Sequence, residues 1–179
     1  MARPSYLIYN SAMATTAAPV AQPTGTAIRT MMQLKAATGY YGKVVAWGAS
    51  FDSVTAIAPG KLELIETDVG ATALTTAYAA ADIQLYSNPN VAANTAGTSG
   101  VPFNLGTSAS GFSTAAVTEG STTASRMVDV AQFDPAFTPY GPQWWPLCRE
   151  FELIPQRFLR VRATFGTTTN LICWVLVEF

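Results

Sequence analysis

The most informative absence in this sequence is histidine, which does not occur among its 179 residues. Histidine is the commonest general base and the commonest side-chain metal ligand, so Ser-His-Asp and Cys-His catalytic arrangements are impossible within the chain. No nucleophile-elbow, phosphate-loop or dinucleotide-binding motif is present in their place. We therefore expect a protein that is not an enzyme and that holds no cofactor.

Cysteine is nearly absent as well, with only Cys148 and Cys173 in the chain. Each lies in an apolar, strand-like stretch, so both are predicted to be buried thiols. The pattern leaves a disulfide between them open, should the two strands be neighbours, although synthesis in the cytoplasm argues against one. Two cysteines without histidine do not make an ordinary zinc site, and no metal is expected.

Charge is equally scarce, since charged residues make up 12% of the chain against a usual ~25%. Ten basic residues stand against eleven acidic ones, so no basic stripe is present for binding nucleic acid. No apolar run reaches the roughly 18 residues of a membrane-spanning helix. The apolar core at Tyr6–Tyr9 is also too short for a cleaved signal peptide. We expect no membrane partner and synthesis in the cytoplasm.

The first 36 residues differ in composition from the rest. Ser11–Thr26 is rich in alanine, threonine and proline, and its prolines break any helix. Short strands are expected on either side of it, at Tyr6–Tyr9 and Ala27–Leu34. We interpret residues 1–36 as an extended N-terminal arm that becomes ordered on a neighbouring subunit, and residues 37–179 as the folded domain.

From Gly42 onward the sequence pattern is β throughout. In Arg157–Phe165, mostly apolar residues alternate with mostly polar ones, and a turn then leads into the apolar stretch Leu171–Phe179. This pattern predicts a hairpin over Arg157–Phe179. Ala71–Tyr86 is expected to hold a short helical turn or strand and then a strand, and Asn88–Gly111 a long loop. Further strands are predicted at Lys43–Phe51, Lys61–Val69, Phe112–Val117, Arg126–Phe133 and Trp144–Glu152. The predicted fold is mostly β: a single-domain, antiparallel β-sandwich of jelly-roll type.

Carboxylate pairs are the remaining candidates for chemistry, because two of them can hydrolyse glycosides without histidine. Glu63 and Glu66 are three positions apart and so fall on opposite faces of a strand. Glu150 and Glu152 share a face beside Arg149. We interpret these carboxylates as solvated or arginine-paired rims rather than as catalytic pairs.

The segment Phe133–Trp145 (FDPAFTPYGPQWW) is the most distinctive local feature, because its aromatic residues alternate with three prolines. It ends in Trp144 and Trp145. Adjacent residues of a strand face opposite ways, so only one of these tryptophans can enter the core. The other needs cover from a loop, a ligand or a neighbouring subunit. We expect subunit packing or a locally covered lid, with a sugar-binding platform as the alternative.

Several segments carry a resemblance: AWGASFD (Ala46–Asp52), LELIETDV (Leu62–Val69), TEGSTTASRMVD (Thr118–Asp129), and QWWPLCRE followed by PQRFLRVRA. Together they resemble a family of small virion structural proteins of tailed bacteriophages, and the resemblance covers most of residues 40–178. Cys148 stands where a glycine is expected before the Arg-Glu pair, and the N-terminal arm has no counterpart. The resemblance implies a particle component without saying which one.

The leading hypothesis is a capsid decoration (cement) protein that stabilises a phage head by binding the outer shell and neighbouring copies. Its expected partners are the major capsid protein and further copies of the chain, in a homo-oligomer such as a trimer on the virion surface. The arm, the 88–111 loop and the tryptophan region would make the contacts. The candidate interface residues are Tyr6, Ile8, Tyr9, Phe137, Tyr140, Trp144, Trp145 and Arg149. The alternatives are a minor tail or head–tail component and a carbohydrate-binding β-sandwich.

Overall fold

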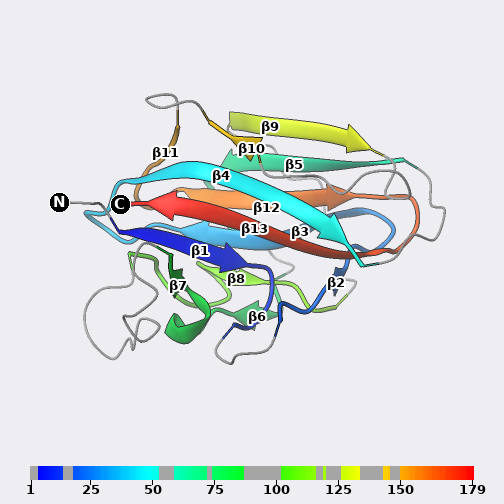
Figure 1. Cartoon of the computed structure of the whole chain (residues 1–179), viewed down its shortest axis with the longest axis horizontal. Coiled ribbons are helices and arrows are strands. Elements are labelled where there is room, and N and C mark those ends of the chain that lie inside the picture. The colour runs from blue at the N-terminus through cyan, green and yellow to red at the C-terminus, as the bar shows by residue number, and fades with distance from the viewer. Residues whose placement is uncertain are drawn as a thin grey trace.

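In the computed structural model, the chain forms two antiparallel β-sheets that lie face to face (Figure 1). The structure describes residues 4–13, 18–52, 59–71, 74–86, 102–115, 119, 126–133, 143–145 and 150–179. Every strand pair among these residues is antiparallel. The fold class predicted from the sequence, a mostly β antiparallel sandwich, is therefore confirmed.

The first sheet has seven strands and is built around β13 (Asn170–Glu178). β13 pairs on one side with β4 (Gly42–Phe51) and on the other with β1 (Ser5–Tyr9). Four short strands complete the sheet: β10 (Gln143–Trp144) and β11 (Phe151–Leu153) on β4, β7 (Gln84–Leu85) on β1, and β2 (Gln22–Pro23) on β13. Both edges of β13 are paired, so its backbone amides and carbonyls are satisfied within the sheet.

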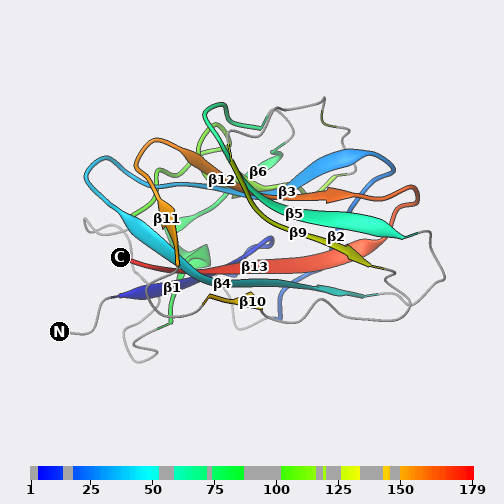
Figure 2. The same ribbon diagram turned by 90° about the horizontal axis from the view of Figure 1, so that it is seen from above.

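The second sheet has six strands, with β12 (Phe158–Thr164) between β3 (Ile28–Lys35) and β5 (Gly60–Thr67). Its outer strands are β8 (Gly111–Phe112) and β6 (Thr76–Ala77) beyond β3, and β9 (Arg126–Phe133) beyond β5. Among the described residues the only helical element is a short 3₁₀ turn, η1 (Ala80–Asp82). Figure 2 shows the two layers from above, with β4 and β13 below β3, β12 and β5.

The core lies between the two sheets and is filled by alternate residues of their central strands. These are Leu159, Val161 and Ala163 from β12, and Leu171, Cys173, Val175 and Val177 from β13. Their period of two is what a strand with one buried face requires. Cys173 is a free thiol, and burial raises its pKa above the ordinary value. Cys148 lies outside the described residues.

The predicted hairpin over Arg157–Phe179 is wrong, although both of its strands exist. β12 belongs to the six-stranded sheet and β13 to the seven-stranded sheet, so the turn between them crosses from one sheet to the other. Phe165, which is 2% exposed, packs in the core within this crossing. The crossing sets the apolar face of each strand against that of the other, whereas a hairpin would have left both faces on the same side of one sheet.

The extended N-terminal arm is not confirmed, and neither is the jelly-roll connection. β1 lies between β13 and β7, and β3 lies between β8 and β12, so residues 5–9 and 28–35 belong to the two sheets. Asn10 fixes the chain after β1: its Nδ2 donates to the Leu171 carbonyl at 2.9 Å, and its Oδ1 accepts from the Cys173 amide at 2.8 Å. The described residues of Ser11–Thr26 contain no helix, as the composition predicted, but the composition carried no information about strand pairing.

Other predicted segments are shorter or more interrupted than expected. The predicted strand Trp144–Glu152 is divided into β10 and β11, which both pair with β4, and residues 146–149 lie outside the described residues. Residues 88–101 of the predicted loop also lie outside them, whereas Phe103 is buried and bridges Ala36. No helix in the described part of the chain is long and apolar enough to cross a membrane.

Candidate functional surfaces

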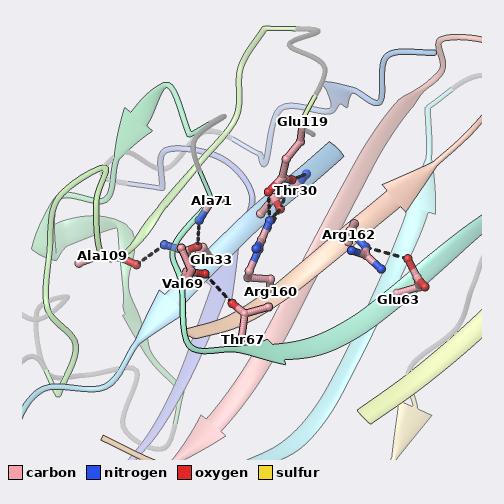
Figure 3. Close-up of polar contacts among 10 residues, drawn as sticks. All are labelled: Thr30, Gln33, Glu63, Thr67, Val69, Ala71, Ala109, Glu119, Arg160 and Arg162. Carbon is pink, nitrogen blue, oxygen red and sulfur yellow. Dashed lines mark hydrogen bonds and ion pairs between the residues drawn. The ribbon is translucent and has the colours of Figure 1, made fainter. Parts of the chain in front are cut away.

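Arg160 belongs to a buried ionic network on the outer face of the six-stranded sheet. It alternates with core residues along β12, so its side chain points away from the core. Arg160 pairs with Glu119 and donates from Nε and Nη2 to Thr30 Oγ1, at 3.0 and 2.6 Å. Glu119 also accepts from the Thr30 amide at 2.8 Å (Figure 3). Burial, with a smaller contribution from Arg162, lowers the pKa of Arg160 to about 10, so it stays charged at neutral pH.

Glu63 forms a second ion pair on the same face. Arg162 Nε donates to Glu63 Oε2 at 2.8 Å, and Lys61 Nζ lies 3.0 Å from Oε1. Burial raises the pKa of Glu63, but the hydrogen bonds and charges of Arg162 and Lys61 outweigh it, so the pKa lies below its ordinary value. A general acid needs a raised pKa, and this carboxylate has the opposite.

Glu66 is held in the same manner at the end of β5. Arg126 Nη2 lies 2.8 Å from Oε2 and Arg157 Nε lies 3.1 Å from Oε1. The prediction that Glu63 and Glu66 are arginine-paired is therefore confirmed, but they are not solvated, since they are 2% and 3% exposed. Within the described residues, no group of three or more acidic or cysteine side chains is placed to hold a metal ion.

Gln33 fastens two covering segments to the outer face of the six-stranded sheet (Figure 3). Its Nε2 donates to the Ala109 carbonyl at 2.8 Å, and its Oε1 accepts from the Ala71 amide at 2.7 Å. Nearby, Thr67 Oγ1 donates to the Val69 carbonyl at 2.8 Å. Gln33 is fully buried as a result. The middle of this face is closed by the chain itself, so binding of another molecule has to use other surfaces.

At the end of the sandwich where the termini lie, several chain segments meet side by side (Figure 1). Lys35, Thr67 and Phe158 are register partners, so β3, β5 and β12 reach the same level there. The turns beyond these strands are joined by backbone hydrogen bonds, from Asn104 to Lys35, from Ala37 to Pro102 and from Gln156 to Ala36. These bonds tie together the segments near Tyr40, Leu105 and Ile154, and Val69 follows β5 at the same level.

This end of the sandwich carries five exposed, mostly apolar side chains, which we call the apolar end: Tyr40, Tyr41, Val69, Leu105 and Ile154. Tyr41 and Val69 are 72% and 64% exposed. The ring of Tyr40 also packs edge-on against Phe179, with centroids 6.1 Å apart. Large apolar side chains gathered on one surface are typical of contacts with another macromolecule.

A second candidate surface is a hollow on the outer face of the seven-stranded sheet. Its volume is about 250 Å³, and it is lined by Leu7, Tyr9, Tyr86, Trp174 and Leu176. These residues come from β1, β13 and the end of β7, at positions that alternate with core residues. None of the five carries a formal charge at neutral pH, so the hollow suits an uncharged ligand or an apolar surface.

No protein-family model matches this chain, and neither does any curated protein or solved structure. The argument for a function therefore rests on the apolar end, the hollow and the chemistry of the buried network.

The structure places the predicted interface residues of β1 on two different faces. Tyr6 and Ile8 are core residues, 7% and 0% exposed, so their prediction as interface residues is wrong. Tyr9 faces the other way and lines the hollow. Trp145 packs against the core, as expected for one tryptophan of the pair, and its backbone amide donates to the Val45 carbonyl at 3.2 Å.

The remaining predicted interface residues do not form one cluster in the described structure. The backbone of Trp144 lies in β10 and pairs with Ala46. Phe137, Tyr140 and Arg149 lie outside the described residues. The predicted contact region around Trp144 is therefore neither supported nor contradicted by neighbouring side chains.

The interface residues predicted from the sequence did not include Trp174, Tyr40, Tyr41 or Tyr86. Trp174 stands between the core residues Cys173 and Val175, so the alternation of β13 already assigns it to the outer face. The alternating pattern of the sequence was therefore sufficient to predict the position of Trp174. Nothing local indicated that Tyr9 and Tyr86, which are far apart in the chain, would lie beside it.

Proposed function

We propose that this chain is a structural, non-enzymatic protein of a phage particle, a decoration protein that docks on the assembled shell. The observation that carries the proposal is the apolar end, where Tyr41 and Val69 are mostly exposed in a chain with few charges. The same hypothesis followed from the sequence. The protein would be made in the host cytoplasm and act on the outer surface of the virion.

Docking would be driven by burial of the apolar end. A large apolar side chain contributes roughly 1.5–3 kcal/mol when it is fully buried, before the costs of association are subtracted. Tyr40 and Tyr41 are well suited, because a tyrosine buries a large ring and keeps its hydroxyl at the rim of a contact. The same end carries the exposed carboxylates Asp68 and Glu152, beside Val69 and Ile154, so a docked partner has to leave them solvated at the rim or pair them.

The partners would be the major capsid protein and further copies of this chain, arranged around a symmetry axis of the shell as a homo-oligomer such as a trimer. Symmetry repeats each contact, so a modest interface per copy adds up over the particle. The ion pairs of Glu63 and Glu66 and the Arg160 network keep the sandwich fixed in shape. The mechanism is mechanical: a rigid sandwich held at shell junctions resists the outward pressure of packed DNA.

The first test is the copy number of this chain relative to the major shell protein, measured by quantitative mass spectrometry of gradient-purified particles. A ratio near one, or a simple fraction of it, is expected for a decoration protein. A handful of copies would instead indicate the tail or head–tail component. Complete absence from the particle would reject both.

The second test measures rebinding of purified variants to particles depleted of this chain. The double variant Tyr41→Ser/Ile154→Ser should bind at least about tenfold more weakly, because it removes apolar area from the apolar end. Val20→Ser is the matched control, since Val20 is 63% exposed and precedes β2, which pairs with the start of β13 at the opposite end. Equal binding of both variants would contradict docking through the apolar end.

A further inference from the structure

The hollow on the seven-stranded sheet has features of a ligand site that docking through the apolar end does not use. It is lined by three aromatic side chains, Tyr9, Tyr86 and Trp174, together with two leucines. Its volume of about 250 Å³ lies near the lower limit of ligand pockets, which suits a single ring rather than a long ligand. We propose that this hollow binds a neutral sugar ring, a pyranose unit of an oligosaccharide.

The ring of Trp174 forms a fixed floor for such a ligand. Its strand β13 is paired on both edges, with β4 and with β1. The ring lies against Gly48 of β4: a Cβ atom added at that position would stand 2.8 Å from Trp174 Cζ2. The glycine therefore allows the indole to lie close to the sheet surface. A ring held in place before binding loses little freedom when a ligand stacks on it.

The two tyrosines supply the polar component of the site. Both line the same hollow. Burial, followed by the nearby Tyr86, raises the pKa of Tyr9 above its ordinary value. A phenol offers both an apolar ring and a hydroxyl that donates and accepts hydrogen bonds. Tyr86 is 58% exposed, so its hydroxyl is available to an incoming molecule.

The chemistry of the hollow selects among ligand classes. A pyranose has C–H faces that stack on aromatic rings and hydroxyls at its edge, and the hollow offers rings and phenol hydroxyls in the same way. An anionic ligand is disfavoured, because no lysine or arginine among the described residues lines the hollow. The hollow takes one ring, so the neighbouring rings of an oligosaccharide would lie outside it.

The site is separate from the surface used in the proposed function. Four of the lining residues lie on the outer face of β1 and β13, and Tyr86 follows β7, with its amide bonded to the Ser5 carbonyl. The apolar end consists of the turns beyond β3, β5 and β11, together with Leu105. The two surfaces share no residue, so variants can change one without changing the other. Failure of either proposal therefore leaves the other standing.

The test is titration of the purified chain with a panel of neutral oligosaccharides: maltohexaose, cellohexaose, chitohexaose and mannohexaose. Binding is followed by calorimetry and tryptophan fluorescence. At least one member of the panel should bind, and Tyr86→Ala and Trp174→Ala should each weaken that binding about tenfold or more. Tyr9→Phe, which removes only a hydroxyl, should weaken it by a smaller factor. The matched control is Tyr41→Ala, at the apolar end, which should bind as the unchanged chain does.

Each variant is first checked for an unchanged thermal unfolding midpoint. Should Trp174→Ala fail to fold, Tyr86→Ala and Tyr9→Phe still decide the matter, because they alter an exposed side chain and a single hydroxyl. The proposal is overturned when no oligosaccharide of the panel binds at millimolar concentration, or when binding persists unchanged in these variants. The proposal is also overturned when the chain dimerises and the same variants abolish dimerisation, since a second copy of the chain would then occupy the hollow.

Discussion

Two arginines on neighbouring strands are both fully buried, but their surroundings differ. Arg160 on β12 faces the outer side of its sheet and pairs with Glu119 and Thr30. Arg29 on β3 is the register partner of the core residue Ala163, so it points between the sheets. In the described part of the chain its Nε, Nη1 and Nη2 find no hydrogen-bond partner. Burial lowers its pKa to about 10, so the side chain remains charged in the core at neutral pH.

Replacing Arg29 should therefore stabilise the fold. Arg29→Met removes an unpaired buried charge and keeps much of the side-chain volume, so the free energy of unfolding should rise by roughly 1 kcal/mol or more. Arg160→Met is the matched control and should lower it by about 3 kcal/mol, because it leaves the Glu119 carboxylate buried without its arginine. Urea unfolding followed by circular dichroism measures both. A loss of stability in Arg29→Met would show that the guanidinium has a favourable partner.

At the residue scale, the sequence indicated the pairing of charges but not their burial. Arg160 and Arg162 alternate with apolar residues, and Glu63 and Glu66 lie in another alternating strand, so arginine-paired carboxylates were a sound prediction. The outer face of a sheet is ordinarily solvated, and an alternating pattern carries no information about what covers it. Gln33 holds the segments around Ala71 and Ala109 over this face, and Glu119 pairs with Arg160; local patterns do not connect any of these segments to β3 or β12.

At the scale of elements, β1 is an inner strand although it stands near the start of the chain. It pairs with β13 over five register positions, Ser5 to Tyr9, and with β7 on its other side. It supplies Tyr6 and Ile8 to the core. The sequence that follows β1 is rich in alanine and proline, and this composition suggested an extended arm. Composition does not indicate whether the preceding strand pairs within a sheet.

Truncation distinguishes an arm from an inner strand. Deleting residues 1–10 removes β1, exposes one edge of β13 and leaves a gap where Ile8 was buried. The loss of Ile8 alone costs about 2–5 kcal/mol by analogy with large-to-alanine changes, so cooperative unfolding should be lost. Thermal unfolding followed by circular dichroism is the measurement, and deletion of residues 1–3, which keeps all of β1, is the control. A truncated chain that still unfolds cooperatively near the original midpoint would restore the arm interpretation.

Strand positions were more predictable than strand partners. The pattern located β4, β5, β9, β12 and β13 to within a few residues, because period-two alternation and turn residues are local. Partner choice depends on which apolar faces meet, and that is settled by the whole chain. The wrong hairpin over Arg157–Phe179 illustrates this limit: Gly166 and the residues after it form a turn, but the turn connects two sheets.

At the scale of the whole molecule, the two ends of the sandwich differ in character. The residues of the apolar end lie beside Pro4 and the C-terminal Phe179. The Phe179 amide donates to the Pro4 carbonyl at 3.0 Å, and the Phe179 ring contacts Tyr40. The other end carries the crossing turn, in which Gly166, Thr167 and Thr168 are exposed. The low overall charge of the sequence favoured a protein that acts by surface contact, but it did not indicate which surface makes the contact. The difference between the two ends of the sandwich gives a docking orientation that can be tested.

Attaching a bulky domain at each end tests that orientation. A small globular domain fused after Phe179 would stand beside Tyr40 and should reduce binding to depleted particles at least about tenfold, by steric exclusion from the shell. The same domain inserted between Thr167 and Thr168 lies at the opposite end and should leave binding unchanged. Both fusions must first show the thermal unfolding midpoint of the parent chain, because exposed turns and termini usually tolerate insertion. The bound fraction is then read after gradient sedimentation. Normal binding of the C-terminal fusion, together with loss of binding in the Thr167 insertion, would reverse the orientation and point to the end that carries Val20.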